Sequence, residues 1–363
     1  MATHTAIAAT SKGVLEAIQV KTEKPGRGEV LVKVAYSSMI AFDTYITDLG
    51  YHVKEYPAVL GFNASGTVAE VGLGVDDLAV GDRVTAFAYQ SSKARGMQQY
   101  AILSRTVCAK IPDDAEIALD AAVTIPDNFI TAFFTLFDNL ELPLPVSFPS
   151  DLAPPHADTP ILVYGAGATS GQYAIQLLKL AGYKNIVATA SARHHDNLRS
   201  LGATHVFDYS DPNLAAGILS AVGGSIQLAV DCVTAEGTLA IISQVLSPNG
   251  TIAILLPVKE GNAVRGAHDA QMYMEMPPHK NPFESTVRIL GVQTFKYQKN
   301  EHLRDNLMQK ILPSLLSMKA IKPNRVRLLD QGDLKERVEI GLDLLRNNKV
   351  SGEKVVVKID DEA

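Results

Sequence analysis

The chain has 363 residues and a formal net charge of −6, and 47% of its residues are hydrophobic. This length allows two domains with separate cores, and the acidic balance argues against nucleic acid as a main partner. Cys108 and Cys232 are the only cysteines and lie far apart, which excludes a disulfide framework or a cysteine zinc cluster. No apolar run approaches the roughly 18 residues of a membrane span, and no secretory signal is evident, so we expect a soluble cytoplasmic protein.

Residues 1–125 are predicted to form a β-rich domain. Segments 30–36 and 66–72 are rich in β-branched and apolar residues, and we predict a strand in each. At 80–84, Val-Gly-Asp-Arg-Val favours a turn into a third strand, where Asp82 with the following arginine forms an ion pair or a turn bond. Short strands at regular spacing indicate a compact barrel-like domain.

The middle of the chain alternates between strand and helix patterns. A helical pattern over 120–137 is followed by a loop at 143–160 that contains six prolines. Predicted strands then follow at 161–164, 186–190, 206–209, 228–233 and 251–256, with helices at 172–182 and 239–246. This alternation predicts a doubly wound parallel sheet with ligands at the carboxyl ends of its strands.

A turn of small residues joins the strand at 161–164 to the helix that follows. Gly165, Gly167 and Gly171 are spaced G-x-G-x-x-x-G, one residue longer than the standard dinucleotide fingerprint. A glycine turn can serve packing alone, but a strand, turn and helix also present backbone N–H groups and a positive dipole end to a pyrophosphate. The second strand completes the βαβ unit of a dinucleotide site.

The end of that second strand indicates which nucleotide binds. An NAD site places Asp or Glu there, whereas this chain has Ser191-Ala192-Arg193-His194. A hydroxyl and a guanidinium suit a 2′-phosphate, which a carboxylate would repel. An ordinary polar turn is the alternative. We predict NADPH as the cofactor.

The C-terminal part is predicted to return to the β-rich domain. A strand is predicted at 290–295, a helix at 303–318 interrupted by Pro313, and a helix at 334–345. The final predicted strand, 353–359, has no helix after it and so cannot extend the alternation. The predicted domains are therefore 1–125 with 300–363, and 126–299.

Several stretches together resemble the medium-chain dehydrogenase/reductase superfamily. They are Phe42 to Ile46, Val59 to Gly61, Ser65 to Val68, Val80 to Val84, Thr131-Ala132, the 161–182 turn and helix, Leu201 to Ala203, and Val350 to Val355. The resemblance implies an α/β fold in which a GroES-like β domain carries a Rossmann sheet, with the first domain as substrate and catalytic domain and the second as NADP(H)-binding domain.

Within this superfamily the chain resembles the zinc-free, quinone-reductase-like branch. The Gly-His-Glu motif of zinc alcohol dehydrogenases is Gly61-Phe62-Asn63 here, and no cysteine lies near Ser37 and Ser38. No metal is expected, because zinc needs a cage of nitrogen, sulfur or carboxylate ligands. The pattern is closest to fungal trans-acting enoyl reductases, although Ile40-Ala41 replaces a common Asn-Pro and the related enzymes can carry Lys where Tyr45 stands.

The resemblance implies the positions of the site residues. Tyr45 and Thr131 would act at the reacting atoms, Tyr45 as proton or hydrogen-bond donor and Thr131 as a positioning hydroxyl. Packing for Tyr45 and a helix cap for Thr131 are the alternatives. Cofactor-binding residues would be Ala41, Phe42, Asp43, Thr44, Gly167, Ala168, Thr169, Ser170, Ser191, Ala192, Arg193, His194, Tyr209, Leu255, Leu256, Ser351 and Gly352.

Three functions stay open on the sequence. The first is NADPH-dependent reduction of the activated C=C bond of an enoyl thioester or enone, beside a polyketide synthase partner. The second is a quinone reductase of detoxification type, and the third is a non-catalytic NADPH-binding regulatory protein. The fold alone does not choose among them.

Overall fold

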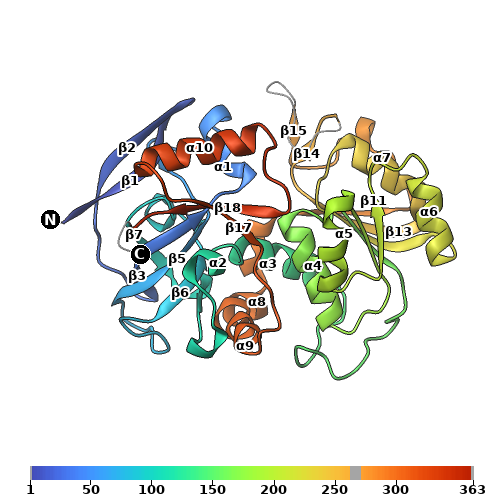
Figure 1. Cartoon of the computed structure of the whole chain (residues 1–363), viewed down its shortest axis with the longest axis horizontal. Coiled ribbons are helices and arrows are strands. Elements are labelled where there is room, and N and C mark those ends of the chain that lie inside the picture. Colours follow the sequence, from blue (N-terminus) through green and yellow to red (C-terminus); the bar gives the residue numbers. More distant parts are fainter. Residues whose placement is uncertain (1, 262–270, 361–363) are drawn as a thin grey trace. The chain divides into compact units, whose positions relative to one another are not determined.

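The computed structural model describes residues 2–261 and 271–360, and the chain divides into two compact units. One unit combines residues up to Asp127 with those from Gln298 onward, and the other comprises residues from Asn128 to Tyr297. In Figure 1 the first unit accordingly carries colours from both ends of the sequence, and the second carries the middle ones. The second unit is therefore an insertion in the first.

The first unit is built on a seven-stranded sheet. Its order is β17-β18-β3-β5-β6-β8, and β7 also pairs with β3. The bounds are β3 Glu29–Ser38, β5 Asn63–Val71, β6 Arg83–Phe87, β7 Tyr100–Ser104, β8 Cys108–Lys110, β17 Arg325–Leu329 and β18 Glu353–Lys358. The last strand, β18, pairs antiparallel with β3, which confirms that the C-terminal strand returns to the N-terminal β domain.

Smaller elements complete the first unit. Three strands form a second sheet of order β2-β1-β4. Its strands are β1 Thr3–Ser11, β2 Val14–Lys21 and β4 Ala58–Val59, and the helices of the unit are α1 Ala41–Leu49, α2 Leu119–Ala122, α8 Glu301–Asn306, α9 Leu312–Ser317 and α10 Leu334–Arg346. The helix predicted at 303–318 is thus α8 and α9 joined by a π-helical turn, with Pro313 in the first turn of α9, where no backbone donor is needed.

The strand β3 lies at the centre of this sheet and is largely buried. Val30, Val32 and Val34 on one face are fully buried, and Leu31 on the other face is 8% exposed. A Cβ at Gly66 on the neighbouring β5 would lie 2.0 Å from the Lys33 carbonyl oxygen, so only glycine lets the two strands approach this closely.

The predicted turn at residue 82 is present, and its ion pair has a different partner from the one expected. The Ala79 N–H donates to Asp82, which makes the turn bond. The ion pair is formed with Lys110, at 2.8 Å, rather than with Arg83. Asp82 and Lys110 come from segments far apart in sequence, so neighbour-based reasoning could not find the pair.

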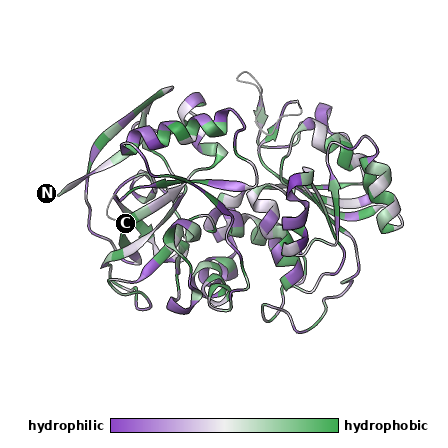
Figure 2. Ribbon diagram, viewed as in Figure 1, coloured by the Kyte–Doolittle hydropathy of each residue, from purple (hydrophilic) through white to green (hydrophobic). Residues whose placement is uncertain are grey.

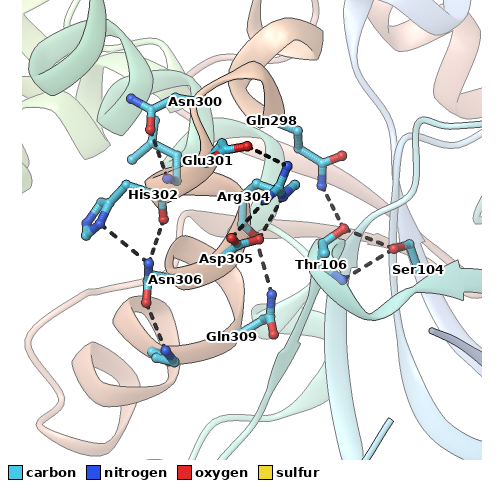
Figure 3. Close-up of polar contacts among 12 residues, drawn as sticks. Ser104, Thr106, Gln298, Asn300, Glu301, His302, Arg304, Asp305, Asn306 and Gln309 are labelled. Carbon is cyan, nitrogen blue, oxygen red and sulfur yellow. Dashed lines mark hydrogen bonds and ion pairs between the residues drawn. The ribbon is translucent and has the colours of Figure 1, made fainter. Parts of the chain in front are cut away.

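Polar contacts fasten the returning chain to the β domain (Figure 3). The Gln298 side chain donates to the Thr106 hydroxyl at 2.9 Å, and that hydroxyl bonds to Ser104. The side chain of Asn300 caps α8 by accepting from the Leu303 N–H at 3.2 Å. A capping box between Asp333 and Glu336 begins α10, along which hydrophilic and hydrophobic residues alternate in Figure 2, as an amphipathic helix requires.

The second unit contains a six-stranded parallel sheet of order β11-β10-β9-β12-β13-β16. Its strands are β9 Ile161–Tyr164, β10 Ile186–Ala190, β11 His205–Asp208, β12 Ile226–Asp231, β13 Leu246–Leu255 and β16 Arg288–Val292. Its helices are α4 Thr169–Leu180, α5 His195–Leu201, α6 Leu214–Val222 and α7 Glu236–Val245, and α3 Pro126–Phe133 leads into it. This order confirms the doubly wound Rossmann sheet.

Packing between the sheet and its helices forms the core of this unit. Leu162 and Ile252 from the strands and Ile218 and Leu239 from the helices are all fully buried in one cluster. One boundary was predicted wrongly: residues 293–295 follow β16 and open a 3₁₀ turn, Thr294–Lys299, instead of extending the strand. No helix in the described part of the chain is both long and apolar enough to cross a membrane.

Candidate functional site

The turn between β9 and α4 has a shape that depends on its glycines. Gly165 has a φ of +71°, and a Cβ there would lie 2.5 Å from the Val233 side chain. A Cβ at Gly171 would lie 2.7 Å from the Cα of Ala166, so α4 packs directly on the turn only because residue 171 has no side chain. The Gly165 N–H donates to the Thr189 hydroxyl, which ties the turn to the neighbouring strand β10.

The first turn of α4 has backbone N–H groups that no side chain caps. Its N-cap, Ala168, has no side-chain oxygen, so the cap makes no side-chain hydrogen bond. The Thr169 hydroxyl donates to Asn128 at 3.0 Å, and the Gln172 side chain donates to the Gly167 carbonyl at 3.1 Å. These bonds fix the turn, and the positive end of the helix favours a phosphate.

The four residues from 191 to 194 follow β10 at the same edge of the sheet. Arg193 is exposed, whereas His194 is buried. A Cβ at Gly167 would lie 3.2 Å from the imidazole of His194, so this ring packs against the glycine turn. Arg193 is therefore the cation presented at this position, and Tyr209, more than half exposed, follows the adjacent strand β11.

A carboxylate that sequence reasoning overlooked also lies at this edge. Asp208 is the last residue of β11, opposite Ala190, and its Oδ2 accepts from the Ala192 N–H at 3.2 Å. Its Oδ1 accepts from the Ser210 hydroxyl and N–H, and these bonds lower the pKa of Asp208. The turn after β10 thus carries no acidic residue of its own but has one beside it.

Two hydroxyl groups meet near the ends of β13 and β16. Thr131 lies inside α3, so the alternative that it caps a helix is wrong. Its hydroxyl lies 2.9 Å from that of Thr294, which follows β16. Leu255 ends β13 and pairs with Val292 of β16, and Leu256 follows it, so these residues share the carboxyl edge of the sheet.

A carboxylate that is fully buried, Asp231, also lies at this edge. Asp231 ends β12 and accepts from the N–H groups of Val233 and Thr234 and from the Thr238 hydroxyl, at 2.8, 2.9 and 2.5 Å. Burial raises the pKa of Asp231. Burial also lowers the pKa of Lys259 to about 8, and Asp231 partly opposes that shift. The signal for Asp231 in the sequence was a carboxylate at the end of an apolar strand.

In the first unit the helix α1 carries the residues predicted for the nicotinamide end and for catalysis. Ala41 is exposed, Phe42 is half-buried, and Asp43, Thr44 and Tyr45 are buried. The two oxygens of Asp43 accept from the N–H groups of Ile40 and Gly61, each at 2.9 Å. Burial raises the pKa of Asp43 to about 6, although Arg95 and Lys354 pull it down. Asp43 therefore joins the start of α1 to the Gly61 turn.

The pKa of Asp43 predicts a pH dependence of stability. The folded state binds the carboxyl proton of Asp43 at a higher pH than the unfolded state does. The contribution of Asp43 to the free energy of unfolding is therefore largest below about pH 4 and falls as the pH rises through about 6. Relative to Asp43→Asn, wild type is expected to gain on the order of 3 kcal/mol of unfolding free energy between pH 7 and pH 4. Urea unfolding of both proteins at each pH measures this, and a constant difference would contradict it.

Aromatic rings surround Tyr45. Phe42 contacts Tyr45, Tyr51 and Phe62, with ring centroids 6.0, 5.6 and 5.3 Å away. The Arg95 guanidinium lies 3.7 Å from the centre of the Phe62 ring. Tyr45 is thus a member of an aromatic cluster, made up of Phe42, Tyr45, Tyr51 and Phe62, in the β domain.

A hydrogen-bond network occupies Ser37, Ser38 and Asn63, the positions that the resemblance described above compares with zinc ligands. The Asn63 amide donates to the Ser38 hydroxyl at 3.0 Å, and its oxygen accepts from the Asp127 N–H. Ser38 in turn donates to the Val123 carbonyl, and Ser37 to the Asn63 carbonyl. Among residues 2–261 and 271–360, no three His, Cys, Asp or Glu side chains are grouped to hold a metal ion.

The predicted residues therefore form two sets, one in each unit. In the second unit, the glycine turn and the residues after β10, β11 and β13 share one edge of the sheet. In the first unit, α1 carries one group, and Ser351 with Gly352 lies immediately before β18, where Gly352 has a φ of +67°.

Comparison with protein families gives matches in both units. Residues 26–113 match the alcohol dehydrogenase GroES-like domain, and residues 171–264 match the zinc-binding dehydrogenase domain. A trans-enoyl reductase of Alternaria alternata, ACTTS2, is 31% identical over 317 residues, which cover 84% of each chain. The trans-enoyl reductase himH of Aspergillus japonicus is 28% identical over 91% of this chain and 90% of its own.

Solved structures have the same fold. The CurK enoyl reductase superposes with a TM-score of 0.74 at 20% identity, covering 98% of this chain and 99% of that one. A quinone oxidoreductase of Pseudomonas syringae gives the same score, identity and coverage. By its sequence relatives and by this fold, the chain belongs to the medium-chain dehydrogenase/reductase superfamily of nicotinamide-dependent oxidoreductases.

Proposed function

We propose that the chain is an NADPH-dependent, metal-independent reductase of activated C=C bonds in enoyl thioesters or enones. The observation that carries the proposal is the glycine-shaped turn into α4, next to an exposed arginine, in a chain related along most of its length to trans-enoyl reductases. In this proposal the second unit holds the cofactor and supplies Thr131, and the first unit supplies Tyr45 and the substrate-binding residues.

The residues present in the second unit suit NADPH. Gly167, Ala168, Thr169 and Ser170 would hold the pyrophosphate, since α4 begins there without a side-chain cap. Arg193, with Ser191, would hold the 2′-phosphate, and Tyr209 would cover the adenosine. Leu255 and Leu256 would flank the nicotinamide. When bound, NADPH supplies the hydride for the β-carbon of the substrate.

Tyr45 is proposed as the hydrogen-bond or proton donor. Reduction at the β-carbon develops negative charge on the substrate's carbonyl oxygen, and a phenol placed near that oxygen stabilises the charge. Tyr45 is only 6% exposed and packs against Phe42 and Tyr51, and a hydrogen bond made in such an apolar surrounding is stronger than one in water. Thr131, paired with Thr294, would position the reactants without donating a proton.

The substrate class follows from the relatives. Trans-enoyl reductases are among them, so we propose an acyl-thioester substrate and, by the resemblance described above, a polyketide synthase as partner in the cytoplasm. NADPH oxidation followed at the reduced-nicotinamide absorbance, with enoyl thioesters, enones and quinones as acceptors, tests this directly. Turnover of thioesters or enones supports the proposal. Turnover of quinones alone would support a quinone reductase, and NADPH binding without turnover a regulatory protein.

The cofactor preference is expected to depend on Arg193. Arg193→Glu places a carboxylate at the 2′-phosphate position and is expected to lower the kcat/KM ratio of NADPH over NADH by at least about tenfold. Arg199→Glu is the matched control, because Arg199 is exposed on α5 and pairs with Asp196. An unchanged ratio in Arg193→Glu would show that another group, or no group, selects the 2′-phosphate.

A further inference from the structure

A half-buried arginine, Arg95, has a guanidinium nitrogen without a hydrogen-bond partner among the described residues and lies beside the aromatic cluster of Tyr45. Nη1 of Arg95 is inaccessible to water and makes no hydrogen bond within the described residues. Burial lowers the pKa of Arg95 to about 10, while Asp43 opposes the shift from a distance. An unsatisfied buried donor destabilises a fold, and a ligand that accepts its hydrogen bond removes that cost.

Tyr51, a member of the aromatic cluster, also has a hydrogen-bond donor without a partner among the described residues. The hydroxyl of Tyr51 is also buried and without a hydrogen-bond partner among residues 2–261 and 271–360. Burial raises the pKa of Tyr51, so it stays a neutral donor. Its ring packs against Phe42 and, at 6.4 Å between centroids, against Tyr45.

The aromatic cluster links these two donors. Arg95 lies over Phe62, Phe62 packs edge-to-face on Phe42, and Phe42 packs on Tyr51. The unused donors therefore belong to one apolar neighbourhood that also contains Tyr45. Few polar groups placed among aromatic rings are typical of small-molecule sites, where the rings bind the chain and the polar groups select it.

We propose that Arg95 and Tyr51 bind a carbonyl or hydroxyl oxygen on the acyl chain of the substrate. This inference rests on the proposed function and deepens it, because it makes the substrate an oxygenated acyl thioester rather than a plain alkenoyl one. A site built to hydrogen-bond an oxygen discriminates strongly against the analogue that lacks it.

The charges of the neighbourhood favour a neutral oxygen over a carboxylate. The positive charge of Arg95 is already opposed by the buried Asp43, and the other buried pair, Asp127 with Lys354, is closed at 2.6 Å. A carboxylate would add an uncompensated charge to this apolar region, whereas a ketone or hydroxyl would accept the unused N–H and O–H without one.

Binding of unreactive, saturated N-acetylcysteamine thioesters to the full chain with NADP+ tests the proposal. Calorimetry would compare octanoyl, keto-octanoyl and hydroxy-octanoyl thioesters, and a carboxylate-ended chain of the same length. We expect the oxygenated chains to bind at least about tenfold more tightly than octanoyl. Arg95→Met and Tyr51→Phe are expected to bring the ratio of the dissociation constants of the octanoyl and oxygenated chains close to one. Arg95→Lys is expected to keep part of the difference.

Matched variants separate recognition from structure. Arg27→Met removes an exposed arginine of the same unit, and Tyr100→Phe removes a hydroxyl outside the cluster; both are expected to keep the wild-type ratio. Any of four results would overturn the inference. These are equal losses of affinity for oxygenated and plain chains in the variants, a wild-type ratio near one, tightest binding of the carboxylate-ended chain, and no binding of any thioester. Selective binding without turnover of the enoyl forms would instead refute the proposed reductase and leave the recognition pair standing.

Discussion

Replacing Lys354 with methionine is expected to lower the free energy of unfolding by about 3–5 kcal/mol. The ammonium of Lys354 lies 2.6 Å from a carboxylate oxygen of Asp127, and the two side chains are only 4% and 10% exposed. The substitution leaves the Asp127 charge buried without this partner. The pair joins β18 to the start of α3, next to Asn63, which accepts the Asp127 N–H. Urea unfolding of both proteins measures the loss.

Two further variants show whether burial causes that effect. Lys319→Met breaks an exposed pair with Glu116, whose side chains are 54% and 76% exposed, and is expected to cost less than about 1 kcal/mol. The double variant Lys354→Met with Asp127→Leu removes both buried charges and is expected to recover much of the stability. A loss for Lys354→Met no larger than that for Lys319→Met would contradict this explanation.

Replacing Tyr45 with phenylalanine is expected to lower kcat by about a hundredfold or more. The change removes only the hydroxyl and keeps the ring that packs against Phe42 and Tyr51. Since the cofactor is proposed to bind mainly through the second unit, the affinity for NADPH should stay close to that of wild type. Steady-state kinetics with an enoyl thioester, together with direct titration of NADPH, separate these two quantities.

Tyr100→Phe is the control for this loss, because Tyr100 lies outside the aromatic cluster and packs on His4. If Tyr45→Phe kept kcat within about threefold of wild type, the hydroxyl would not be the donor. Tyr45 would then be a packing residue, and the donor would have to be another group near the substrate's carbonyl.

Features that depend on local sequence could be predicted. The run of small residues from Gly165 to Gly171 between an apolar strand and a helix identified the turn, because φ values and close packing there require glycine. Apolar runs identified the strands of the parallel sheet, and the absence of a helix after the last strand indicated its return to the first domain.

Contacts between distant segments could not be predicted in the same way. Asp208 reaches the Ala192 N–H only because β11 pairs with β10 in one particular register. The burial of His194 against Gly167 depends on how the chain turns after β10. The sequence did not single out Arg95, because what distinguishes it is a buried Nη1 that has no hydrogen-bond partner among the described residues. Only the structure shows that property.

Transfer of a labelled hydride tests the central claim most directly. NADPH carrying deuterium at the transferable C4 position would be incubated with the chain and an enoyl thioester, and the saturated product analysed by mass spectrometry and NMR. The account predicts one deuterium per product molecule, at the β-carbon, with the α-hydrogen taken from solvent. A product labelled at the α-carbon, an unlabelled product, or no reduction of any enoyl thioester or enone would contradict it.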